Sequence, residues 1–134
     1  MFKLALVINK DTHNPANIKM TTIELNELYE VLIPVNPVYD WLVDNAANIN
    51  YELLKGFITN IIPLGDAGKN YFKIVANKKT GFTKELWNLY IKLEKMYYEG
   101  NLKISSYLEL TYLGYTGGLL GGKCPVDDVI KYDK

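Results

Sequence analysis

The chain contains no arginine, one histidine and one cysteine among its 134 residues. Arginine is the side chain that reads guanine and clamps phosphate through paired hydrogen bonds, so its absence argues against a sequence-specific DNA reader or an arginine finger. Cys124 has no partner for an internal disulfide, which favours a reducing, cytoplasmic location. His13 and Cys124 lie near opposite ends of the sequence, and no pair of residues has the spacing of a zinc site. We therefore expect no metal and no cofactor.

A net charge and a long apolar run are missing as well. No apolar run reaches the roughly 18 residues that a membrane span requires, so we expect no contact with membranes. Fifteen lysines balance fifteen acidic residues, and a chain without net charge has no overall field to steer it toward nucleic acid. The many Lys, Asn, Ile and Tyr residues are those of A/T-rich codons. This bias suggests an AT-rich genome, such as that of a low-GC bacterium, its phage or plasmid, or a large virus.

Apolar residues make up 49% of the chain, which is enough for a core, and the composition predicts one compact domain over residues 1–134. The expected fold class is α+β, with a small, mainly antiparallel sheet. Alternating or short apolar runs predict its strands at about 2–9, 71–76 and 102–113. In the last of these, the alternation would bury Leu108 and Tyr112 and leave Tyr107 on the exposed face.

Helical periodicity predicts one long helix over residues 83–99, packed against the sheet. It also predicts a cluster of three shorter helices, at 22–33, 37–46 and 51–61. Thr21 and Glu24 have the spacing of a capping box, in which each side chain accepts a hydrogen bond from the other residue's backbone amide. These helices would form an insert between the first two strands.

The glycine-rich segment 114–125 carries the most suggestive motif. Gly117 to Lys123 match the G-x-x-x-x-G-K spacing of a phosphate-binding loop. However, Cys124 occupies the position of the magnesium-binding Ser or Thr, and Pro125 follows where a helix should continue. We interpret the segment as a structural loop.

The long helix is apolar around most of its circumference, and its charged residues share one stripe. Glu94 is the exception, because it lies opposite that stripe among Tyr90, Tyr97 and Tyr98. Desolvation there would raise the pKa of its carboxyl group, which makes Glu94 a weak candidate for a catalytic acid or base. The alternative is a carboxylate that reaches solvent or accepts a tyrosine hydrogen bond.

Aromatic side chains are the strongest remaining signal, because tyrosine and tryptophan dominate binding hot spots. The candidate partner-binding residues are Trp87, Tyr98, Tyr107, Tyr112 and Tyr115. They favour a non-enzymatic, intracellular protein-binding protein, such as a small phage- or plasmid-encoded inhibitor or an immunity-type protein. Its partner would be a host protein or a second copy of the chain. Two alternatives stay open: a structural or assembly subunit, such as a virion component, and a small enzyme that uses Glu94.

Overall fold

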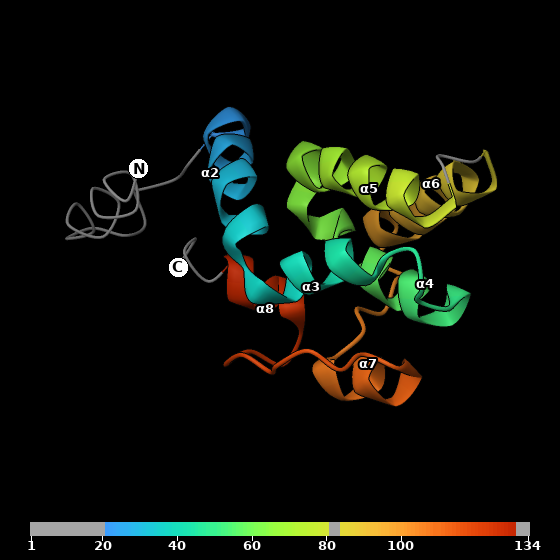
Figure 1. Ribbon diagram of the computed structural model, residues 1–134. Helices are drawn as coiled ribbons and strands as arrows, with labels where there is room; N and C mark the ends of the chain where they lie inside the picture. Colours follow the sequence, from blue (N-terminus) through green and yellow to red (C-terminus); the bar gives the residue numbers. More distant parts are fainter. Residues whose placement is uncertain (1–20, 81–83, 131–134) are drawn as a thin grey trace.

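The computed structural model describes residues 21–80 and 84–130, and every regular element in these ranges is a helix (Figure 1). The elements are α2 (Thr22–Val35), α3 (Pro37–Asn45), α4 (Tyr51–Thr59), the 3₁₀ helix η2 (Ile62–Leu64), α5 (Gly65–Thr80), α6 (Lys84–Tyr98), α7 (Tyr107–Leu113) and α8 (Pro125–Ile130). The described residues form no strand, so the predicted α+β fold is wrong. The predicted strand at 2–9 lies outside the described residues.

The predicted strand at 71–76 is the middle of α5. Its buried residues come in pairs four positions apart, which is the period of an α-helix and not of a strand. The pairs are Tyr71 with Phe72 and Val75 with Ala76, and Ala67 lies one turn earlier. Six residues rich in aromatic and β-branched side chains show too little of this period to be distinguished from a buried strand.

The predicted strand at 102–113 is also a helix over its second half, because Ser106 caps α7. The Ser106 Oγ accepts a hydrogen bond from the Glu109 amide at 3.2 Å, and the Ser106 amide donates to Glu109 Oε1 at 2.9 Å. These bonds form a capping box. The helix ends at Gly114, whose φ of 125° is one that glycine adopts readily. The predicted burial is reversed here, since Tyr107 is buried while Leu108 and Tyr112 are exposed.

The four predicted helices are confirmed. The helices expected at 22–33, 37–46 and 51–61 correspond to α2, α3 and α4, and the long helix expected at 83–99 corresponds to α6. The capping box between Thr21 and Glu24 is present, with bonds of 2.8 and 3.1 Å. The helix α2 continues two residues past its predicted end and includes Pro34.

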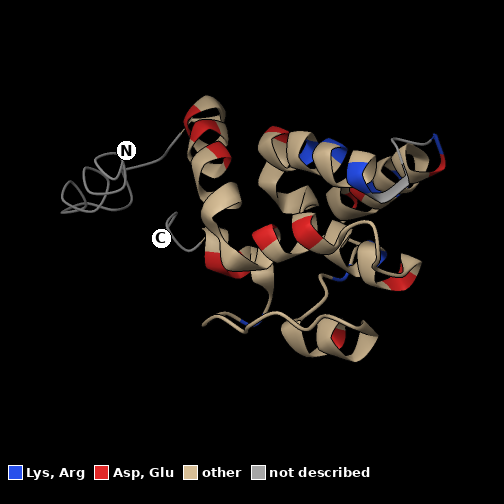
Figure 2. Ribbon diagram, viewed as in Figure 1, with Lys and Arg blue, Asp and Glu red and all other residues tan. Residues whose placement is uncertain are grey.

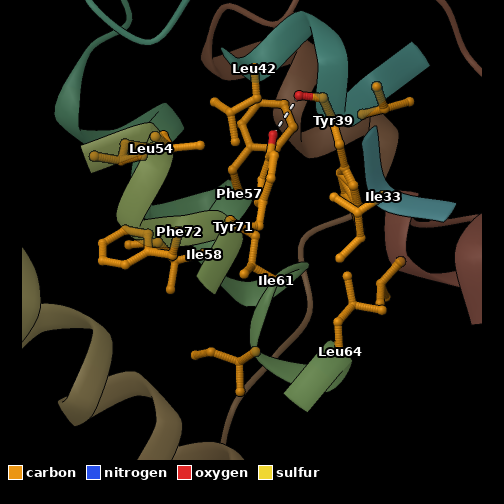
Figure 3. Close-up of a cluster of buried hydrophobic side chains, with 14 of the residues drawn as sticks. Ile33, Tyr39, Leu42, Leu54, Phe57, Ile58, Ile61, Leu64, Tyr71 and Phe72 are labelled. Carbon is orange, nitrogen blue, oxygen red and sulfur yellow. Dashed lines mark hydrogen bonds between the residues drawn. The ribbon is translucent and has the colours of Figure 1, made fainter. Parts of the chain in front are cut away.

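The core lies where α3, α4, η2 and α5 meet, and its largest side chains are fully buried (Figure 3). Polar groups inside it bond to distant parts of the backbone. The Tyr71 hydroxyl donates to the Tyr39 carbonyl oxygen, and the Tyr39 hydroxyl donates to the Asn60 carbonyl oxygen at 2.7 Å. The Asn60 side chain donates to the Ser105 carbonyl oxygen at 2.9 Å and accepts from the Val126 amide at 3.0 Å. Asn60 therefore joins α4 to the segment before α7 and to α8.

Candidate functional site

The helix α7 presents large apolar side chains to solvent. Leu108 is 80% exposed and Tyr112 is 90% exposed, and four-residue spacing places them on one helix face. A shallow recess of about 620 Å³ is lined by Leu108, Glu109, Thr111, Tyr112 and Leu113. We call these five residues the α7 surface. Adjacent exposed apolar side chains of this size are typical of an interaction site.

The opposite face of α7 holds the helix firmly on the body of the protein. Leu110 is completely buried, and the Tyr107 hydroxyl donates to Asp128 Oδ2 at 2.6 Å. At the end of the helix, the Asn50 side chain donates to the Leu113 carbonyl oxygen at 3.1 Å. Just beyond it, the Tyr115 ring packs edge-on against Trp41, with 4.8 Å between ring centroids. The α7 surface is therefore preformed, which reduces the entropy lost when a partner binds.

A buried carboxylate lies beneath this helix. Asp128 is only 6% exposed, and its second oxygen accepts a hydrogen bond from the Gly122 amide at 2.7 Å. Burial, and then the hydrogen bond to Asp128, raise the pKa of Tyr107 well above its usual range. Asp128 thus joins α7, the glycine-rich segment and α8 through two charge-assisted hydrogen bonds.

The glycine-rich segment uses its backbone amides for bonds within the protein. The Gly122 amide binds Asp128, and the Cys124 amide donates to Asp127 Oδ2 at 3.3 Å. Carboxylates of the chain itself therefore bind amides that a phosphate-binding loop would offer to a nucleotide. Cys124 is buried, and burial raises the pKa of its thiol, which disfavours the nucleophilic thiolate.

The structure separates the five predicted binding residues. Tyr107 and Tyr115 lie together in the core, 5% and 2% exposed, with 6.4 Å between their ring centroids. Trp87 is partly buried, and its ring has the Lys73 Nζ atom 5.6 Å from its centroid. Tyr98 on α6 and Tyr112 on α7 are the exposed members of the set, at 70% and 90%.

Sequence reasoning placed Tyr112 on the wrong side of α7, and it missed Leu108 as a binding residue. The expected strand put it on the packed face, whereas the helix turns it outward. The signal that could have found it is the S-x-x-E spacing of Ser106 and Glu109. That spacing predicts that a helix starts near residue 106, in the middle of the expected strand.

Glu94, the candidate catalytic residue, forms an ion pair with Lys69 of α5. The Lys69 Nζ and Glu94 Oε2 atoms are 3.2 Å apart, and the Glu94 side chain is 21% exposed. The Tyr90 hydroxyl is buried without a hydrogen-bond partner. Burial, and then the charge of Glu94, raise the pKa of Tyr90. The Glu94 charge is thus balanced by a lysine, and its catalytic role stays a prediction.

No known family matches the chain. Curated proteins and solved structures gave no match either. Across residues 21–80 and 84–130, no helix has both the length and the apolar character of a membrane span. Nor do three or more His, Cys, Asp or Glu residues come together in these ranges as a possible metal site.

Proposed function

We propose that the chain is a non-enzymatic protein-binding protein that contacts its partner through the α7 surface. The observation that carries this proposal is the exposure of Leu108 and Tyr112, 80% and 90%, on a helix whose other face is anchored in the core. Burial of a leucine or an aromatic side chain gains about 1.5–3 kcal/mol. A partner that covered both side chains would therefore gain binding energy without reshaping the helix.

Several observations support a binding role over catalysis. The Glu94 carboxylate is paired with Lys69, and the Asp128 carboxylate is tied to Tyr107 and to a backbone amide. The recess on the α7 surface is lined mainly by apolar side chains, with Glu109 as its charged member. Such a surface fits an apolar helix or a shallow hydrophobic patch on another protein.

The proposal extends to where the protein acts. A single cysteine and the AT-rich residue usage support action in the cytoplasm of a bacterial host, as expected for a phage- or plasmid-encoded inhibitor or an immunity-type protein. In that setting the partner is a host protein, or a toxin that the chain neutralises.

The test is site-specific photocrosslinking in a low-GC bacterial host. A photoreactive phenylalanine analogue replaces Tyr112 in one protein and Tyr98, which is also exposed, in a second protein as a matched control. We expect one defined adduct from position 112, at least tenfold stronger than any adduct from position 98. Leu108→Ser should abolish that adduct while circular dichroism stays unchanged. Equal adducts from both positions, or an adduct that survives Leu108→Ser, would overturn the proposal.

A further inference from the structure

The zero net charge of the chain conceals a marked separation of charge along it. Residues 21–50 contain five carboxylates and no lysine, whereas residues 51–103 contain nine lysines and five carboxylates. Figure 2 shows the result: acidic residues occupy α2 and α3, and lysines gather on α5. Two copies of such a molecule attract each other when the acidic part of one faces the basic part of the other.

The acidic part includes a helix face open to solvent. Ile23, Glu27, Glu30 and Pro34 are all exposed, and their spacing places them on one stripe of α2. Ile23 is 73% exposed, and Val31 beside the stripe is 40% exposed. The stripe thus combines apolar and acidic side chains, as do helices that lie in a groove of another protein.

A groove of complementary character lies between α4, α6 and the segment that leads into α7. It has a volume of about 550 Å³ and contains three lysines: Lys103, which is paired with Glu109, and Lys55 and Lys92, which are exposed. Glu52 is the single acidic residue among those that line it. Leu89 and Met96, both partly exposed, add apolar surface. The groove therefore offers lysines to the acidic side chains of the α2 stripe and apolar surface to its exposed Ile23.

The two surfaces belong to opposite ends of the molecule, because α2 lies at one end and the α4–α6 region lies at the other (Figure 1). They are too far apart to meet within one copy. We propose that the α2 stripe of one copy docks in the groove of a second copy, with Glu27 and Glu30 facing Lys55 and Lys92. A contact between two different surfaces repeats from copy to copy, so it builds an open, head-to-tail assembly.

This inference goes beyond partner binding at the α7 surface. The groove adjoins that surface at Leu113, which lines both, and through the ion pair between Lys103 Nζ and Glu109 Oε2, which are 3.0 Å apart. Leu108 and Tyr112 lie outside the groove, so an assembly would display the α7 surface once per copy. Such repetition would strengthen binding to a multivalent partner through effective concentration.

The first experiment is sedimentation velocity of the full chain at two ionic strengths. Near 0.01 M salt the Debye length is about 30 Å, whereas near 1 M it is about 3 Å. We expect the mean mass to rise with protein concentration above the monomer mass of 15.3 kDa at low salt, and to return to it at high salt. A monomer at every concentration and salt level overturns the proposal.

Two charge-reversed proteins then identify the surfaces. Glu27→Lys with Glu30→Lys disables the stripe, and Lys55→Glu with Lys92→Glu disables the groove. Each protein alone should remain at the monomer mass. An equal mixture should assemble again, because each surface of one charge-reversed protein meets a surface of opposite charge on the other. A chain that carries all four substitutions should assemble again, since the charges are exchanged.

Controls separate this contact from other forms of association. Glu85→Lys reverses an exposed charge of α6 outside the groove and should leave assembly unchanged. A symmetric dimer through α7 would instead resist salt and would be lost with Leu108→Ser. That result, or a mixture of the two charge-reversed proteins that stays monomeric, would overturn the head-to-tail contact. Neither result would bear on the crosslink expected at position 112.

Discussion

At the scale of single residues, two buried polar side chains determine how the C-terminal part of the described chain is held. Asn60 bonds to groups 45 and 66 residues away in the sequence. Asp128 bonds to Tyr107 and Gly122. A buried polar group that loses its partner costs more free energy than one ordinary hydrogen bond contributes. These residues therefore specify one arrangement of α4, α7 and α8.

Replacing Asp128 with asparagine tests how strongly this carboxylate holds α7 and α8 together. The new amide group would place N–H donors where Tyr107 and Gly122 already donate, so at least one bond is lost and a donor is left buried. We expect the free energy of unfolding to fall by about 2–3 kcal/mol. Urea denaturation followed by circular dichroism measures it.

The matched control for Asp128→Asn is Asp127→Asn. Asp127 is half-buried and accepts a longer bond, 3.3 Å, from the Cys124 amide. We expect Asp127→Asn to lower the free energy of unfolding by less than about 1 kcal/mol. If both variants were equally stable, Asp128 would not hold the C-terminal helices in place.

Residues with local partners could be predicted from the sequence, whereas residues with distant partners could not. Thr21 with Glu24 caps α2, and Asn36 caps α3 by accepting from the Val38 amide at 2.9 Å. Each of these bonds spans two or three residues, so spacing alone reveals it. Nothing near Asn60 or Asp128 in the sequence shows which groups the fold brings to them, so both were missed.

At the scale of elements, two helices were wrongly predicted as strands because their residues are typical of strands. Helix α5 contains the apolar run 71–76, whose buried pairs become clear only across the full range 65–80. For α7, alternation over residues 102–113 outweighed the capping signal of Ser106 and Glu109. That error reversed the predicted burial of Tyr107, Leu108 and Tyr112. Tyr112 was therefore predicted both as a binding residue and as a buried one, and Leu108 was missed.

Ser106→Ala tests how far the cap stabilises α7. Seven residues are too few for a helix to be stable alone, so the capping box and the packing of Leu110 must hold it. We expect the free energy of unfolding to fall by about 1 kcal/mol. Amide exchange at Leu110 and Tyr115, whose amides bond to the Ser106 and Leu110 carbonyl oxygens, should accelerate more than exchange elsewhere.

Thr111→Ala is the matched control within α7, because Thr111 is exposed and lies in the same helix. It should leave amide exchange at Leu110 almost unchanged. If amide exchange at Leu110 were the same in Ser106→Ala as in Thr111→Ala, packing alone would stabilise α7. The α7 surface would then depend on the core and not on its cap.

At the scale of the whole molecule, five buried tyrosines connect stability to pH. Burial raises the pKa of the hydroxyl groups of Tyr39, Tyr71, Tyr90, Tyr107 and Tyr115. These hydroxyls keep their protons in the folded protein and lose them in the unfolded chain near pH 10. Unfolding therefore releases protons above that pH. The stabilisation from neutral tyrosines is complete below about pH 10 and is lost as the pH rises further.

We expect the free energy of unfolding to fall steeply between about pH 10 and pH 11, by as much as about 1.4 kcal/mol per pH unit for each tyrosine that stays neutral when folded. Urea midpoints across this range measure the fall. Tyr71→Phe should make the slope shallower by about one proton, because one buried hydroxyl is removed. Ser106→Ala, which lowers stability but keeps every tyrosine, should leave the slope unchanged. A stability that is flat through pH 11, or the same slope in Tyr71→Phe as in the unsubstituted protein, would mean that these hydroxyls ionise as readily in the folded protein as in the unfolded chain.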